Sequence, residues 1–244
     1  MIADEFLLSA TRLREDVVGE AIAFCRGELA DLGYQITTTQ DFQAVREITR
    51  EMGKEYFTPA LDPLFNDFTA DNCFWQLLIK DGEVCVCGGV RHEALGSTPV
   101  SQFWRNSFKR LYGGGICDQV IDVSPAVDSI LRGDLVYFGD LHVAPKFRGH
   151  LDILSLYLCH GQALVSMKWN PDFTYAFIHD RFVANGAAFR YGFNTVERMA
   201  QHWVSDAPYP RSTFECCAIA DRAQLLSFFS RPERILSRGR RGGA

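Results

Sequence analysis

The sequence lacks any apolar run that approaches the roughly 18 residues of a membrane-spanning helix. Its first residues, Met1 to Glu5, also lack the basic segment that opens a secretory signal. These two absences lead us to expect a cytoplasmic protein with no membrane partner.

Excess positive charge is absent as well. The net charge of the 244 residues is -5, so no overall basic field favours nucleic acid as a partner.

The eight cysteines lack the spacing of a zinc site, because one residue separates Cys85 from Cys87 and no second Cys/His pair accompanies them. We therefore expect no metal, and reduced cysteines that pack as small apolar residues.

The order of periodic segments predicts a mixed α/β fold. Apolar residues at helical spacing predict a helix over 4–32, and Asp41 is placed to cap a second helix. Asp81-Gly82 predicts the turn of a β-hairpin between extended runs at 74–80 and 84–92. Further strands are expected at 34–39, 135–143, 173–178, 195–204 and 214–220, and further helices at 151–168, 180–192 and 223–229. The run from 135 to 178 then forms one parallel βαβ crossover.

These segments divide the chain into three parts. Residues 1–33 form a helical extension, residues 34–230 form the main domain, and residues 231–244 form a basic tail that we expect to be disordered. An insertion at about 96–132 interrupts the main domain. It contains a helical pattern that bears Trp104, Phe108 and Tyr112.

The turn between the crossover strand and its helix has the features of an anion site. Pro145 ends the strand, and Gly149 allows a tight turn before the helix begins. The first backbone amides of a helix have no partner inside it, and with the helix dipole they attract anions. Lys146, Arg148 and His150 add positive charge beside them. The turn is neither a Walker A loop nor a dinucleotide-binding turn, because the required glycines are missing.

In this context, Val143-x-Pro145-x-x-Arg148-Gly149 resembles the acetyl-CoA-binding motif of the GNAT superfamily of N-acyltransferases. The resemblance extends over residues 34–220 and implies a GNAT-like α/β fold with a mixed sheet. It also implies acetyl-CoA or another acyl-CoA as a substrate. The residues expected to contact the acyl-CoA are Leu141, Val143, Lys146, Phe147, Arg148, Gly149, His150, Leu151 and Arg181.

The sequence departs from the family pattern at three positions. Lys146 replaces the Gln or Arg that begins the signature, and Leu151 replaces a small residue where the backbone approaches the phosphates. Many members place a tyrosine four residues before the glycine that closes the next helix, as an acid toward the leaving thiolate. Here that position is Ala188, and Tyr191 is the nearest substitute.

Two further residues are candidates for the general base. Asp140 and His142 alternate with Leu141 and Val143 along the strand, so one pair faces the core helix and the other faces the opposite side. The resemblance places acceptors on that opposite side. Asp140 is the first candidate and His142 the second. The backbone amide of Val143 would be the family-like donor to the thioester oxygen.

The sequence thus predicts an acyl-CoA-dependent N-acyltransferase, in which the amine of a small molecule or peptide attacks directly within a ternary complex. Net acidity favours a cationic acceptor such as a polyamine, an aminoglycoside or a lysine side chain. Two alternatives stay open. The protein could bind acyl-CoA without catalysis, or it could use a longer acyl donor along a channel walled by the aromatic residues of the insertion. The long first helix is one surface through which a homodimer could form.

Overall fold

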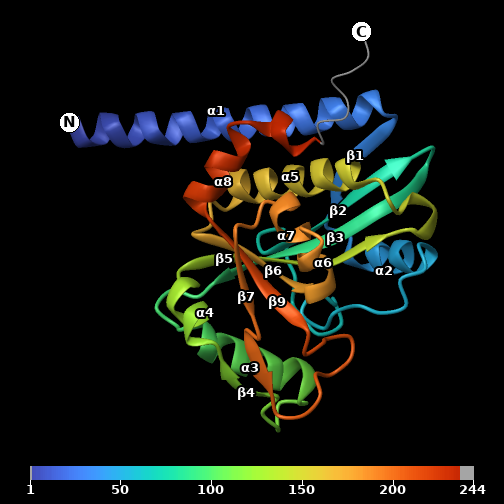
Figure 1. The fold of residues 1–244 in the computed structure, drawn as a ribbon, viewed down its shortest axis with the longest axis vertical. Helices are drawn as coiled ribbons and strands as arrows, with labels where there is room; N and C mark the ends of the chain where they lie inside the picture. Colours follow the sequence, from blue (N-terminus) through green and yellow to red (C-terminus); the bar gives the residue numbers. More distant parts are fainter. Residues whose placement is uncertain (1, 237–244) are drawn as a thin grey trace.

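The computed structural model describes residues 2–236, with side chains from residue 14 onward. The predicted mixed α/β fold is confirmed (Figure 1). A seven-stranded sheet has the order β1-β2-β3-β5-β6-β9-β7. Its strands are β1 (Tyr34–Thr39), β2 (Cys73–Lys80), β3 (Glu83–Ala94), β5 (Asp134–Val143), β6 (Phe173–His179), β9 (Glu215–Asp221) and β7 (Thr195–Arg198). Within this sheet, β5 and β6 are the parallel pair, joined through α5 (Leu151–Lys168) as the sequence predicts.

One face of the sheet is covered by α5, which is itself covered by α1 (Ile2–Asp31) and α8 (Arg222–Phe229) (Figure 1). Val18 and Leu29 of α1 share an apolar core with Leu156 and Ala163 of α5. Because α5 lies between the sheet and α1, it buries side chains on most of its faces. This burial explains why its sequence is apolar all round.

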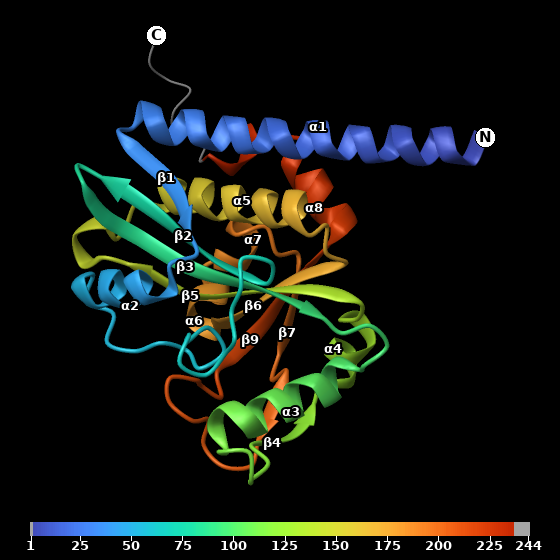
Figure 2. The same ribbon diagram turned by 180° about the vertical axis from the view of Figure 1, so that it is seen from behind.

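The other face is covered by α2 (Phe42–Glu51), α3 (Val100–Tyr112), α4 (Pro125–Ile130) and a two-stranded sheet (Figure 2). That second sheet pairs β4 (Val120–Val123) with β8 (Gln201–Trp203). The start of α2 is fixed by a contact within its own first turn, where the Asp41 carboxylate accepts a hydrogen bond from the Ala44 amide at 3.0 Å. The two layers place the central strands β5 and β6 between two apolar cores.

Two element predictions in the C-terminal half are wrong. The single strand expected over 195–204 is two strands in different sheets, because Met199 adopts a left-handed backbone (φ 53°) between β7 and β8. The single helix expected over 180–192 is split into α6 (Asp180–Ala184) and α7 (Ala187–Arg190). Gly186, at φ 76°, makes the turn between them.

The insertion is more ordered than its sequence indicates, since it contains β4 and α4 besides the expected helix. Trp104 and Phe108 of α3 are buried in the core, where the Trp104 indole donates to the Tyr175 hydroxyl at 3.2 Å. In the predicted tail, a short helix, η2, spans Pro232–Ile235, and residues 237–244 lie outside the described residues. No helix in the described part of the chain is long and apolar enough to cross a membrane.

Candidate functional site

The parallel strands β5 and β6 separate halfway along their length. Their pairing runs from Leu135 and Phe173 to Phe138 and Ala176 and then stops. Beyond that point β5 stays paired with β3, and β6 stays paired with β9. The central sheet therefore contains a gap between the last residues of the two strands, where backbone groups face each other without a ladder.

An irregularity in β5 helps to open this gap. The register between β3 and β5 shifts between Cys87 and Gly89, and Asp140 adopts a left-handed backbone with φ 54°. After this bulge, the Ala144 amide donates to the Cys85 carbonyl at 2.9 Å, whereas the Val143 carbonyl accepts from Arg148 Nε at 3.2 Å. Since the N–H and C=O of one strand residue point to the same edge, the Val143 amide points away from β3 and into the gap.

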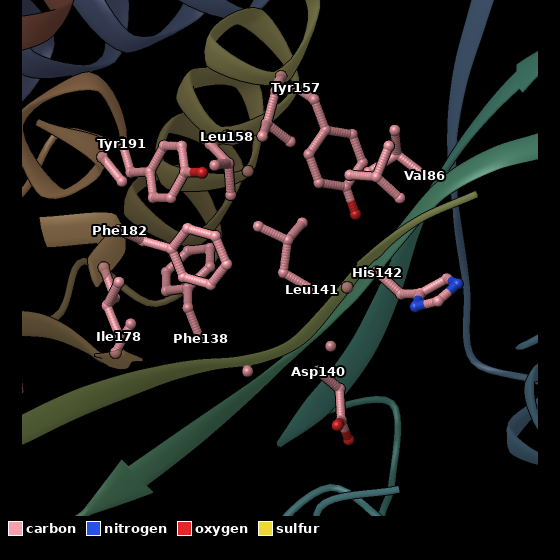
Figure 3. Close-up of a pocket in the computed structure, with 18 of the residues that line it drawn as sticks. Val86, Phe138, Asp140, Leu141, His142, Tyr157, Leu158, Ile178, Phe182 and Tyr191 are labelled. Carbon is pink, nitrogen blue, oxygen red and sulfur yellow. The ribbon is translucent and has the colours of Figure 1, made fainter. Parts of the chain in front are cut away.

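A cavity of about 930 Å³ passes through this gap, because residues from both faces of the sheet line it. We call its two ends the α5 chamber and the Tyr56 chamber. The α5 chamber is lined by Phe138, Leu141, Val143, Leu158, Ile178 and Tyr191. The Tyr56 chamber is lined by Lys54, Tyr56, Thr58, Tyr137, Arg211 and Glu215. Figure 3 shows Leu141 directed toward α5, with Asp140 and His142 directed to the other side of the strand. The predicted alternation of these residues is therefore confirmed.

The turn into α5 forms one wall of the α5 chamber. A short helix, η1 (Pro145–Phe147), is followed by Gly149 at φ 94°, a backbone conformation that favours glycine. The amides of Gly149, His150 and Ile153 have no acceptor among the described residues, and the His150 side chain does not cap the helix. Unpartnered amides at the positive end of a helix, here one of 18 residues, are groups that attract anions.

Most of the residues predicted to bind the ligand line this cavity. They are Leu141, Val143, Phe147, Arg148, Gly149, His150, Leu151 and Arg181. Lys146 does not line it, because its ammonium group forms an exposed ion pair with Glu83 instead. The Arg181 guanidinium lies 4.7 Å from the centre of the Phe182 ring, at the edge of the α5 chamber. Trp104, Phe108 and Tyr112 also lie outside the lining, so the insertion does not wall the cavity with them.

Asp140, the first candidate base, is held inside the protein. Its side chain is 1% exposed, and Oδ1 accepts from Lys54 Nζ at 2.9 Å and from the Thr58 hydroxyl at 2.8 Å. The Thr58 amide donates to both carboxylate oxygens at 3.1 Å. Burial raises the pKa of Asp140, while Lys54 and Thr58 act in the opposite direction. This carboxylate therefore ties the bulge of β5 to the segment 54–58 and has no free surface for a ligand.

His142 has the properties of a neutral base. Its Nε2 lies 3.1 Å from the Met52 carbonyl, which can only accept, so Nε2 carries the proton and Nδ1 keeps its lone pair. Burial lowers the pKa of His142 from 6.5, and the charges of Lys54 and Arg148 lower it further against the opposing Met52 carbonyl. At neutral pH the imidazole is therefore uncharged and able to take a proton.

Tyr191 reaches the cavity from the end of α7. Figure 3 shows its hydroxyl pointing into the α5 chamber toward Leu158. Burial raises the pKa of Tyr191, so the phenol stays protonated and can donate. Ala188, at the position where the sequence resemblance would place a tyrosine, is fully buried. The structure thus brings Tyr191, and not residue 188, to the cavity wall.

Sequence reasoning missed the residues of the Tyr56 chamber. Apart from Tyr137 of β5, they come from the segment 54–58, from the loop before β9 and from Glu215 at its start, and these segments carry no motif. No pattern in the sequence around Lys54 or Arg211 marks these charged residues as buried. No group of three His, Cys, Asp or Glu side chains suited to a metal ion occurs within residues 14–236.

Comparison with known proteins gave matches among solved structures alone. No family model and no curated protein matches the sequence. The chain is similar to a Drosophila melanogaster polyamine N-acetyltransferase at 15% identity and a TM-score of 0.44, over 77% of this chain and 100% of that one. It is similar to Arabidopsis thaliana NAA60, solved with acetyl-CoA, at 13% identity and 0.42, over 77% and 98%. An uncharacterized protein of Bacillus halodurans gives 10% identity and 0.45, over 82% and 90%.

Proposed function

We propose that this protein is an acyl-CoA-dependent N-acyltransferase that transfers an acetyl group to a primary amine. The observation that carries the proposal is the gap between β5 and β6, because it joins an anion-binding turn to a cavity through the sheet. In this assignment the diphosphate of the donor contacts the amides of Gly149, His150 and Ile153, with Arg148 beside them. The thioester arm then extends along the α5 chamber into the gap.

The chemistry follows from the groups at the gap. The Val143 amide donates to the thioester oxygen and stabilises the negative charge that develops there. A neutral amine enters from the Tyr56 chamber and attacks the carbonyl carbon, so that a C–N bond forms and the C–S bond breaks. His142 takes the proton that the amine loses, directly or through a water molecule, and Tyr191 gives a proton to the leaving thiolate. Asp140 acts as a positioning residue that fixes the bulge.

This role for Asp140 differs from the one that the sequence suggests. A base must touch the substrate or a water molecule beside it, and the contacts with Lys54 and Thr58 occupy the carboxylate. His142 keeps a free lone pair and lines the same cavity. We therefore assign the base to His142.

Isothermal titration with acetyl-CoA and with CoA tests the donor site. We expect binding of both, and Arg148→Glu should weaken it roughly tenfold or more, because it replaces a charge-assisted contact with a repulsive one. Lys146→Glu is the matched control: it changes the same charge two residues away, on a side chain that the cavity does not include. Absence of binding of both molecules would refute the proposal, whereas equal losses in the two variants would place the diphosphate elsewhere.

A thiol-release assay with a panel of amines separates catalysis from binding alone. If the protein is the proposed transferase, it releases CoA from acetyl-CoA when a suitable amine is added. Acetyl-CoA binding without release by any amine would instead support a binding protein, and a series of acyl chain lengths would show whether a longer donor is preferred.

A further inference from the structure

The Tyr56 chamber contains two buried ion pairs that cancel its charge. Lys54 is matched by Asp140, and Arg211 is matched by Glu215 through contacts at 2.6 and 2.7 Å to Oε2. The side chains of Lys54, Asp140 and Arg211 are at most 4% exposed. Among the described residues that line the cavity, Asp140 and Glu215 are the only carboxylates. The chamber therefore has no excess negative charge, although the whole protein has a net charge of -5.

Arg211 is held too firmly to serve as a free ligand for a substrate. Its guanidinium carbon lies 4.2 Å from the centre of the Phe177 ring, 5.4 Å from that of Phe108 and 5.5 Å from that of Trp203. Nη2 also donates to the Gln201 side chain at 3.1 Å. Held in this way, Arg211 places two of its nitrogen atoms on a single oxygen of Glu215, Oε2.

The second oxygen of Glu215 stays available. Oε1 has no hydrogen-bond or ion-pair partner within the described chain, and it is not among the buried polar atoms that lack a partner. This oxygen therefore keeps accessible surface, and Glu215 is one of the residues that line the cavity. One carboxylate oxygen can accept a hydrogen bond from one ammonium group.

The remaining surface of the chamber is aromatic. Tyr56, which lines the cavity, meets Tyr209 edge to face at 4.9 Å, and the two are 41% and 72% exposed, so both rings lie toward the protein surface. Deeper in, Tyr137 packs against Phe177 with ring centres 6.0 Å apart. A flat apolar group would lie against such rings, whereas a second cationic group would find no further carboxylate among the described residues that line the cavity and would face Lys54.

We infer that the acceptor is a monoamine with an aromatic body, whose ammonium group binds Glu215 Oε1 and whose ring packs against Tyr56. This inference rests on the proposed transferase function. On leaving Glu215 the ammonium group gives one proton to solvent, and the neutral amine then attacks as described above. The chamber thus selects against polyamines and lysine-rich peptides, contrary to the expectation from net charge.

Binding of amines to the CoA-loaded protein tests this selectivity without catalysis. By isothermal titration, 2-phenylethylamine should bind about tenfold or more tightly than spermidine or butylamine, since it alone combines one charge with a ring. With acetyl-CoA, the same order should appear in kcat/KM for thiol release. Spermidine binding as tightly as 2-phenylethylamine, or better, would overturn the inference.

Two variants assign the selectivity to its residues. Glu215→Gln keeps the shape and removes the charge, and should raise KM for 2-phenylethylamine about tenfold or more while acetyl-CoA affinity stays unchanged. Tyr56→Leu, on a partly exposed side chain, should lower the preference for 2-phenylethylamine over butylamine. Glu47→Gln, on an exposed face of α2, is the control for a lost carboxylate. If Glu215→Gln is poorly folded, Tyr56→Leu alone decides, and an unchanged preference contradicts the inference.

The same measurements distinguish this inference from the proposed function. If the protein binds neither acetyl-CoA nor CoA, the transferase assignment itself fails. If acetyl-CoA binds and spermidine is the better acceptor, the transferase assignment stands and the aromatic monoamine is wrong.

Discussion

Replacing Lys54 by Met removes the cation that neutralises Asp140 inside the protein. The two charged groups are 2.9 Å apart, and their side chains are 4% and 1% exposed. Breaking such a pair leaves an unmatched buried charge, which costs about 3–5 kcal/mol of unfolding free energy. The Thr58 hydroxyl and amide still donate to the carboxylate in the variant, so we expect a loss near the lower end of that range.

Urea denaturation at neutral pH measures this loss, and Lys109→Met provides a matched control. Lys109 Nζ lies 3.0 Å from Asp118 Oδ1, but these side chains are 38% and 74% exposed. The same substitution at the surface pair should cost less than about 1 kcal/mol. Equal losses in the two variants would refute the reasoning, because the buried pair would then cost no more to break than the exposed one.

The sign of the pH dependence gives a second check. Lys54 opposes the increase that burial causes in the pKa of Asp140, so without Lys54 this pKa rises further above its unfolded value and the folded state binds more protons. The defect of Lys54→Met should therefore shrink as the pH falls and Asp140 becomes neutral. The double variant Lys54→Met/Asp140→Asn should recover much of the lost stability at neutral pH, and a double-mutant cycle then gives the coupling energy of the pair.

Three further predictions concern single residues. Burial lowers the pKa of His160 from 6.5 to about 4, so the folded protein binds fewer protons than the unfolded chain between these pH values. About 3 kcal/mol of unfolding free energy should therefore be lost as the pH falls from 6.5 to 4. His160→Gln should flatten this pH dependence when it is measured by urea denaturation. Gly139→Ala should lower the unfolding free energy of the protein by about 1–3 kcal/mol in the same assay, because its new Cβ would lie 2.7 Å from the Tyr137 hydroxyl oxygen. Gly27→Ala, on an open helix face, is the control and should not lower it. Activity should fall below a pKa that is lower than 6.5, the ordinary value for His142, and this acid limb should be absent from the residual activity of His142→Gln.

The predictions that succeeded depend on short-range interactions. Asp41 caps α2 through an amide three residues away, and Asp81-Gly82 turns the β2–β3 hairpin through two left-handed residues. The turn from Val143 to Gly149 is likewise defined within one strand–turn–helix unit. For such units, residue type and spacing already restrict the backbone to few conformations.

Other features depend on contacts between distant parts of the chain. β8 pairs with β4 in a separate two-stranded sheet. The sequence of neither strand indicates this pairing. The local sequence around Met199 also gives no sign of its left-handed backbone, since methionine rarely adopts one.

The turn from Val143 to Gly149 was determined by the sequence itself, because a proline and a glycine restrict its backbone and the first amides of the next helix have no partner inside that helix. The tertiary structure decided which side chains lie around the turn. Lys54 and Asp140 are 86 residues apart in the chain, and their burial as a pair removed the first candidate base from contact with a ligand. Whether a carboxylate is free or neutralised depends on which charges burial brings beside it, and only the packed fold fixes that arrangement.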